Sequence, residues 1–176
     1  MSFNKDLQYS HDDRVLNAYY KYKGFKYIQV ITDLETQKKG IDKILHYGRN
    51  QSTTIDEKKR RTTYDDLLVE TMKNVERNKK GWLYYTQADY IIYWIEPLNK
   101  FYILNFKKLQ EIIFQNDWVN TKPKLNTYVN RIYTTANISL DWVEVEPAIQ
   151  NIISYDIDKI NKKIKFKKES LIKSPF

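Results

Sequence analysis

The stretch TTIDEKKR (residues 53–60) follows a turn-like run and reads as a β-strand. Successive side chains of a strand point to opposite faces of the sheet. Asp56 and Lys58 therefore share one face, and Glu57 points to the other. A carboxylate and an ammonium group two residues apart on one face can converge on a common point, so this strand is the first candidate for a chemical site.

The residues before this strand supply a second carboxylate. Residues 41–47 are expected to form another strand, with Asp42 near its start and a turn at residues 48–51 after it. If the two strands pair antiparallel, Asp42 comes close to Asp56. Bare carboxylates at such a separation repel each other, so either one of them is protonated or a cation lies between them.

A divalent ion at this place would give the site a hydrolytic chemistry. Mg²⁺ fits because it binds few protein oxygens and keeps several waters, and Mn²⁺ could substitute for it. A metal-bound water is acidified and becomes a nucleophile, while Lys58 could orient it or offset charge on a phosphoryl oxygen. The alternative is a chance D-x-K triplet, in which Asp56 and Lys58 form a solvated pair on an exposed strand.

The rest of the chain predicts a helix, several strands, a second helix and a C-terminal region that is hard to assign. The helices are expected at residues 10–22, with Ser10 as N-cap, and directly after Asn105. Further strands are expected at residues 27–31, 67–69, 82–85, 89–95 and 101–104. Residues 151–176 carry seven lysines against three acids and are expected to form a charged edge strand or a basic arm.

This pattern predicts an α+β fold with a central mixed β-sheet flanked by helices. The length of 176 residues fits one domain, residues 1–176, with its core at about residues 10–117 and residues 118–176 as a C-terminal extension with a basic tail. The chain has no cysteine and two histidines, which argues against disulfides and zinc. No apolar run is long enough to span a bilayer, so we expect a cytoplasmic protein without a membrane partner.

The charge and the aromatic content point weakly toward nucleic acid. The formal net charge is +8, and the chain has 15 tyrosines, 7 phenylalanines and 4 tryptophans. Basic side chains attract phosphates, and aromatic rings stack on exposed bases. Lysine-rich and tyrosine-rich sequences also arise from AT-rich genomes, however, so composition alone does not identify the partner.

Four ordered segments carry a more specific resemblance. The strings QKKGID (37–42), TIDEKKR (54–60), LLVET (67–71) and GWLYYTQADYIIYW (81–94) together resemble bacterial and phage proteins of the PD-(D/E)xK, or restriction-endonuclease-like, nuclease superfamily. The resemblance covers about residues 10–106. It implies a restriction-endonuclease-like core and a Mg²⁺-dependent nuclease, with Asp42 as the first acid and Asp56 and Lys58 as the triplet. Ile41 stands where the family motif has proline, a position that varies in the superfamily.

Further site residues follow from the resemblance, each with a structural alternative. Asp13 could be an additional acid from the first helix or part of the helix cap, and Glu70 could be a third metal ligand or a charge at a strand end. Four polar residues near the motifs could contact the phosphates of DNA, or could be ordinary loop and surface groups. They are Gln37, Lys39, Arg60 and Arg61.

Three functions are therefore open at this stage. The leading one is a metal-dependent deoxyribonuclease that hydrolyses phosphodiester bonds, with DNA as partner, and a homodimer if both strands of a duplex are cut. The second is a catalytically silent nucleic-acid-binding module on the same fold. The third is a protein-interaction module, such as a phage-encoded inhibitor.

Overall fold

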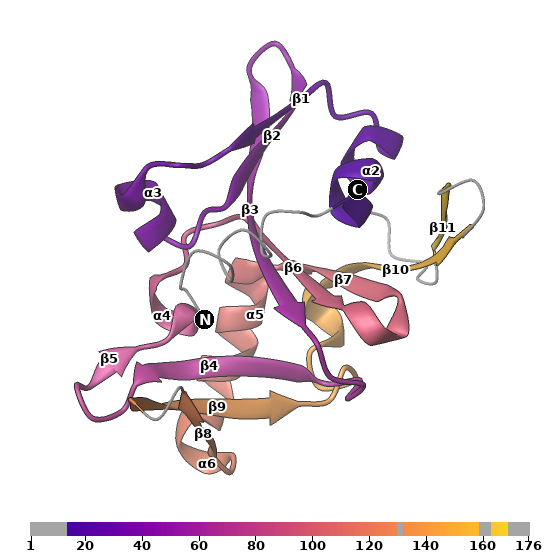
Figure 1. Cartoon of the computed structure of the whole chain (residues 1–176). Helices are drawn as coiled ribbons and strands as arrows, with labels where there is room; N and C mark the ends of the chain where they lie inside the picture. The colour runs from indigo at the N-terminus through magenta and orange to yellow at the C-terminus, as the bar shows by residue number, and fades with distance from the viewer. Residues whose placement is uncertain (1–13, 130–131, 159–162, 169–176) are drawn as a thin grey trace.

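The computed structural model describes residues 14–129, 132–158 and 163–168, and its main feature is a large mixed sheet (Figure 1). Only the pairing between β3 and β6 is parallel, and the other neighbours in this sheet are antiparallel. In spatial order its seven strands are β1 (Tyr27–Val30), β2 (Lys43–Gly48), β3 (Gln51–Arg60), β6 (Tyr90–Ile95), β7 (Lys100–Asn105), β10 (Ile149–Ile157) and β11 (Ile164–Lys168).

A second, smaller sheet is antiparallel throughout, and Figure 1 shows it below the main sheet. In spatial order its four strands are β5 (Lys79–Lys80), β4 (Leu67–Asn74), β9 (Tyr133–Leu140) and β8 (Leu125–Val129). The chain enters this sheet directly after β3 and returns to the main sheet at β6. This detour allows β6 to lie parallel to β3, because parallel neighbours need a long crossover connection.

The helices are few and mostly short. They are α2 (Arg14–Tyr22), α3 (Leu34–Lys38), α4 (Trp82–Tyr85), α5 (Phe106–Gln115) and α6 (Trp118–Thr121), with short 3-10 turns η1 (Glu96–Leu98) and η2 (Glu146–Ala148). The start of α5 follows the sequence prediction, since the Asn105 side chain accepts a hydrogen bond from the Lys108 N–H at 2.9 Å. None of the helices in the described part of the chain is long and apolar enough to cross a membrane.

Strand β6 lies at the centre of the packing because both of its faces are buried. Ile91 and Tyr93 belong to an apolar cluster that includes α5 and the inner face of the smaller sheet. Ile92 and Trp94 belong to a second cluster, which α2 covers on the opposite face. An uninterrupted apolar strand of this kind is what a sheet covered on both sides requires. The main sheet is therefore flanked by helices on both faces, as predicted, and the α+β class is confirmed.

Several sequence predictions of single elements hold, and one is wrong. The strands expected at residues 27–31, 41–47, 53–60, 89–95 and 101–104 are present with small changes at their ends, and the strand expected at residues 67–69 extends to Asn74. Residues 82–85, predicted as a strand, form the single helical turn α4 instead. Their short apolar run fits either element, and the turn is closed by a 3.1 Å hydrogen bond from the Thr86 N–H to the Trp82 carbonyl.

The C-terminal part of the chain contributes to both sheets. Residues 118–176 were predicted to be an extension outside the core, but β9 pairs with β4 and β10 pairs with β7. Of the two forms predicted for the lysine-rich tail, the charged edge strand is the one observed at β11, which ends the main sheet beside β10. Three of its five residues are lysines.

Candidate active site

The triplet on β3 has the geometry that strand alternation predicts. The Lys58 Nζ lies 2.6 Å from the Asp56 Oδ1, and the two side chains share one face of the sheet. Asp56 is fully buried, whereas the Lys58 side chain is a quarter exposed. Lys58 thus links a buried carboxylate to the surface of the molecule.

Asp42, the residue directly before β2, joins this pair. Strands β2 and β3 pair antiparallel, and the Asp42 N–H donates to the Ile55 carbonyl at 2.8 Å. The Asp42 Oδ2 in turn accepts a hydrogen bond of 2.8 Å from the Glu57 N–H. These two bonds hold the Asp42 carboxyl beside Asp56, with which its side chain interacts directly.

Burial and repulsion make the ionisation of Asp56 costly. Burial raises the pKa of Asp56, Lys58 opposes this rise, and the neighbouring Asp42 adds to it, so that the pKa is about 7. Burial lowers the pKa of Lys58, but Asp56 and Asp42 outweigh burial and the net shift is upward. Lys58 therefore stays charged, while Asp56 is poised between its two protonation states near neutral pH.

A loop and the end of α4 hold Asp56 from the other side. The Thr86 Oγ1 donates to the Asp56 Oδ2 at 3.0 Å. Gly40 packs directly on Thr86: a Cβ added there would lie 2.4 Å from the Thr86 Oγ1, and its φ of +63° is in the left-handed region. The Gln87 N–H also donates to the Lys39 carbonyl at 2.8 Å. The loop that precedes Asp42 is thereby fastened to the segment that supports Asp56.

Helix α4 brings aromatic side chains to Lys58. The Lys58 Nζ lies 5.9 Å from the centre of the Trp82 ring. Burial raises the pKa of Tyr85, Lys58 opposes the rise, and Glu70, Asp56 and Asp42 add to it, so Tyr85 lies within the electrostatic reach of the whole site. No role in the site was predicted for Tyr85, which was expected to lie in a strand, or for Thr86, which follows it.

Glu70 lies in the middle of β4, close to the start of α4. Its Oε1 accepts a 3.3 Å hydrogen bond from the Trp82 N–H. Gly81 makes this approach possible, since a Cβ there would lie 2.3 Å from the Glu70 carbonyl oxygen. The observed contact of Glu70 is thus with the first turn of α4, and it is not at a strand end.

The chemistry of the two aspartates fits a divalent ion. Asp42 and Asp56 offer adjacent hard oxygen ligands, and an ion between them would remove the repulsion that helps to raise the pKa of Asp56. In the described ranges, no three His, Cys, Asp or Glu side chains are grouped to hold a metal. Two carboxylates would leave the other positions to water or phosphate oxygens, which is the usual way of binding Mg²⁺.

The remaining residues near the predicted site differ in their contacts and exposure. The Gln37 Nε2 donates to the Ile31 carbonyl at 2.8 Å, so this side chain holds the loop before Asp42. Lys39 is exposed at the end of α3, on the same loop. Asp13 lies outside the described residues. Asp89 fastens the start of β6 to β3 by accepting hydrogen bonds from the N–H and the hydroxyl of Thr54.

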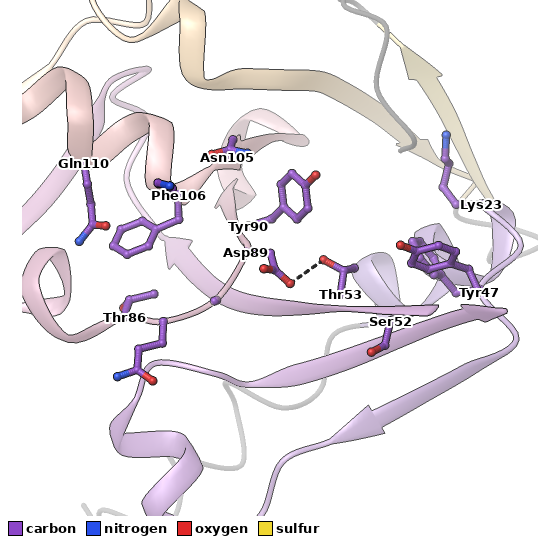
Figure 2. Close-up of a pocket in the computed structure, with 14 residues that line it drawn as sticks. Lys23, Tyr47, Ser52, Thr53, Thr86, Asp89, Tyr90, Asn105, Phe106 and Gln110 are labelled. Carbon is purple, nitrogen blue, oxygen red and sulfur yellow. Dashed lines mark hydrogen bonds between the residues drawn. The ribbon is translucent and has the colours of Figure 1, made fainter. Parts of the chain in front are cut away.

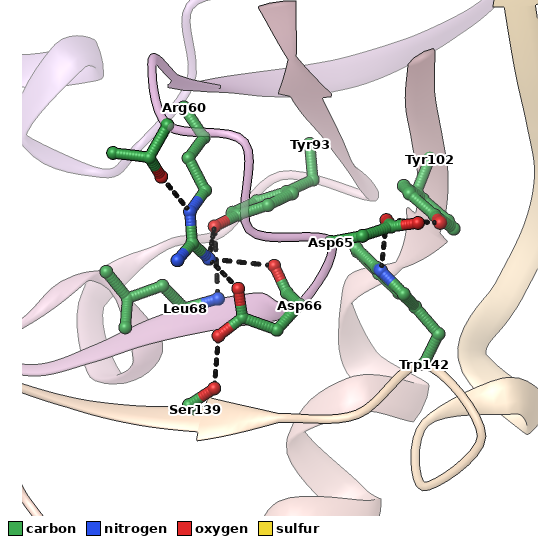
Figure 3. Close-up of polar contacts among 9 residues, drawn as sticks. Arg60, Asp65, Asp66, Leu68, Tyr93, Tyr102, Ser139 and Trp142 are labelled. Atoms are coloured by element: carbon green, nitrogen blue, oxygen red, sulfur yellow. Dashed lines mark hydrogen bonds and ion pairs between the residues drawn. The ribbon is translucent and has the colours of Figure 1, made fainter. Parts of the chain in front are cut away.

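Arg60 is engaged in a structural network away from Asp56. Figure 3 shows its guanidinium group between Asp66 and Tyr93. It forms an ion pair with Asp66 and donates to the Asp66 carbonyl at 2.9 Å and to the Tyr93 hydroxyl at 3.3 Å. Arg61 is exposed at the end of β3. Of the two arginines predicted to bind phosphate, Arg60 thus already has an acidic partner.

On the opposite face of β3, Glu57 forms a second charged cluster. The Lys43 Nζ lies 2.7 Å from the Glu57 Oε1, and the Tyr20 hydroxyl donates to the same oxygen at 2.6 Å. Lys43 is almost completely buried. This cluster packs β2 and β3 against α2 and leaves the Asp56 face to the candidate site.

Comparison of the chain with protein-family models, curated proteins and solved structures found no match.

Proposed function

We propose that this protein is a Mg²⁺-dependent deoxyribonuclease of the PD-(D/E)xK type, with a restriction-endonuclease-like core. The observation that carries the proposal is the meeting of Asp42, Asp56 and Lys58 at one point, two carboxylates and one ammonium group. The order and spacing of the four sequence segments that resemble this superfamily support the same assignment.

Each of these residues has a definite task in such a reaction. Asp42 and Asp56 would hold the ion, and the ion when bound supplies an acidified water and charge neutralisation for phosphodiester hydrolysis. Lys58 keeps its positive charge beside the carboxylates, so it can donate to a phosphoryl oxygen as negative charge grows there. Thr86 fixes the orientation of Asp56 through its hydroxyl.

The decisive experiment is a digestion of plasmid, linear duplex and single-stranded DNA with Mg²⁺ or with EDTA. We expect cleavage only with the ion, and a loss of at least ~100-fold in Lys58→Ala and Asp56→Asn, as for the removal of other preorganised charge-stabilising groups. Lys59→Ala is a matched control, because Lys59 pairs with Glu96 and lies over Trp94 instead of facing Asp56. Circular dichroism should show all variants folded.

The outcomes separate the candidate functions. Cleavage at the wild-type rate by both Lys58→Ala and Asp56→Asn would show that these residues are not the active site. Salt-sensitive DNA binding without cleavage in Mg²⁺ or Mn²⁺ would identify a silent binding module instead. Loss of activity in Lys59→Ala as well would mean that the change in charge, and not the position of Lys58, controls the reaction.

A further inference from the structure

A half-open cavity of about 630 Å³ lies at the end of the main sheet where β3 and β6 begin. Its volume is within the range of ligand-binding sites, roughly 300–1,000 Å³. Figure 2 shows Phe106 and Gln110 at one end, Lys23 and Tyr47 at the other, and Asp89 with Tyr90 between them. None of these residues belongs to the candidate active site.

Thr86 connects this cavity to the candidate active site. It lines the cavity and also donates from its Oγ1 to the Asp56 Oδ2 at 3.0 Å. Thr86 is therefore a wall residue of the cavity that touches the candidate active site directly, although Asp56 itself is fully buried and does not line the cavity. The cavity is thus one residue away from Asp56, close enough to hold a neighbouring part of a polymeric substrate.

The walls of the cavity combine flat rings with groups that can pair with a base edge. Tyr47 is 46 % exposed and Tyr90 is half-buried, so both can present a ring to a ligand, whereas Phe106 is almost fully buried in the core beside the cavity. The Asp89 Oδ2 accepts from Thr53 and Thr54, which fixes the carboxylate at the cavity wall. Aromatic rings stack on bases whatever the sequence, and carboxylate and amide side chains accept from or donate to base edges.

Two positive side chains belong to the cavity lining. Lys107, in the first turn of α5, and Lys23, after α2, line it. Burial lowers the pKa of Lys23, and the ammonium group of Lys168 lowers it further, so an anion beside Lys23 would relieve a like-charge repulsion. Cations flanking a stacking surface suit the phosphates on either side of one nucleotide.

We propose that this cavity binds an unstacked base of single-stranded DNA adjacent to the phosphate at Asp56, an inference that rests on the proposed nuclease function for its substrate. A base within a duplex is paired and stacked, and its extrusion costs a few kcal/mol. The protein then prefers single strands, or unpaired ends and loops, over intact duplex.

The test measures binding in EDTA, where cleavage does not interfere. Fluorescence anisotropy with a labelled 12-nucleotide single strand and with a hairpin duplex of the same composition gives the preference. We expect Tyr47→Ala to weaken single-strand binding roughly 5- to 100-fold, as for the loss of one stacking ring. Ser52→Trp, which fills the cavity from its exposed wall, should weaken it at least as much. Tyr27→Ala is the control, because Tyr27 is exposed on β1 but does not line the cavity.

Equal binding of single strand and duplex, or unchanged single-strand binding in both Tyr47→Ala and Ser52→Trp, would overturn the proposal. Its failure is distinguishable from failure of the proposed function. If the wild-type protein binds single strands through the cavity but cuts no DNA with Mg²⁺, the binding site stands and the nuclease assignment fails. If it cuts DNA and the cavity variants cut and bind as well as wild type, the nuclease stands and the cavity has no role in it.

Discussion

At Asp56, burial and the charged partner Lys58 have opposite effects on the pKa of the carboxyl group. Burial raises its pKa to about 7 although the Lys58 Nζ is 2.6 Å away, and Asp42 adds to the rise. In an unfolded chain the same group titrates near ~3.9. Folding therefore favours protonated Asp56, and this contribution to stability is complete below about pH 4 and is lost as the pH rises toward 7.

We expect Asp56→Asn, without metal, to be more stable than the wild type at pH 8 and to lose this advantage near pH 4. The gain is at most about 4 kcal/mol, since one pKa unit corresponds to about 1.4 kcal/mol. Urea unfolding in EDTA at several pH values measures it. Asp156→Asn, at an exposed pair with Lys167, should bring no such gain. A lower stability of Asp56→Asn at pH 8 would mean that Lys58 stabilises the ionised carboxylate by more than burial costs.

Gly40 is the second residue on which the site depends, because of its contact with Thr86. Gly40→Ala places a methyl group 2.4 Å from the Thr86 Oγ1 and also strains a left-handed backbone. We expect a loss of roughly 2–4 kcal/mol in unfolding free energy together with reduced DNA cleavage, because strain and overpacking each cost about 1–2 kcal/mol.

Gly24→Ala is the matched control for this substitution. Gly24 has a φ of +82°, but a Cβ there would meet nothing within 4 Å. Gly24→Ala should lose about 1–2 kcal/mol in unfolding free energy from backbone strain and keep the full rate of DNA cleavage. Equal activity of the two variants would show that the packing of Gly40 on Thr86 does not support the reaction.

For single elements, the sequence predicted those features that follow from the local periodicity of side chains along a strand or helix. The alternation along β3 placed Asp56 and Lys58 on one face, and the turn after β2 placed Asp42 beside them. Helix α4 was predicted wrongly because a four-residue apolar run carries no period. What fixes it is the close contact between Gly81 and β4, a long-range contact that no local pattern reveals. Thr86 and Tyr85 were missed for the same reason.

Strand β10 shows another limit of sequence patterns. Ile149 belongs to the apolar cluster that includes α5, whereas Ile153 and Tyr155 belong to the cluster under α2, and the pairing with β7 shifts register between Ile149 and Asn151. The polar Asn151 at this shift is completely buried, which no alternation along the strand predicts. The parallel pairing of β3 with β6 also could not be predicted from local sequence patterns, because it depends on the path of the chain through the smaller sheet.

The cap of α5 is an element-scale feature that the sequence did predict. Asn105→Ala removes the acceptor for the Lys108 N–H, and we expect a loss of about 1 kcal/mol in unfolding free energy. Asn105→Ser keeps a capping oxygen and should retain most of this stability. Thermal or urea unfolding measures both. Equal losses in the two variants would assign the effect to packing of the Asn105 side chain rather than to capping.

For the whole molecule, an ion held between Asp42 and Asp56 would tie together two strands that separate on unfolding. A ligand that binds only the folded state stabilises it by about 2.7 kcal/mol at a hundredfold excess over its Kd. We therefore expect Mg²⁺ to raise the melting temperature of the wild-type protein, and to have no such effect on Asp42→Asn or Asp56→Asn.

Glu70→Gln completes this experiment because it decides between the two roles considered for Glu70. The amide oxygen of glutamine can still accept from the Trp82 N–H, so a variant that keeps the full response to Mg²⁺ identifies Glu70 as a support for α4. A response reduced as strongly as in Asp56→Asn would make Glu70 a third ligand from the smaller sheet, and the ion would then join the two sheets. If Mg²⁺ stabilises all variants equally, the ion binds elsewhere, and the pair of Asp42 and Asp56 does not hold it.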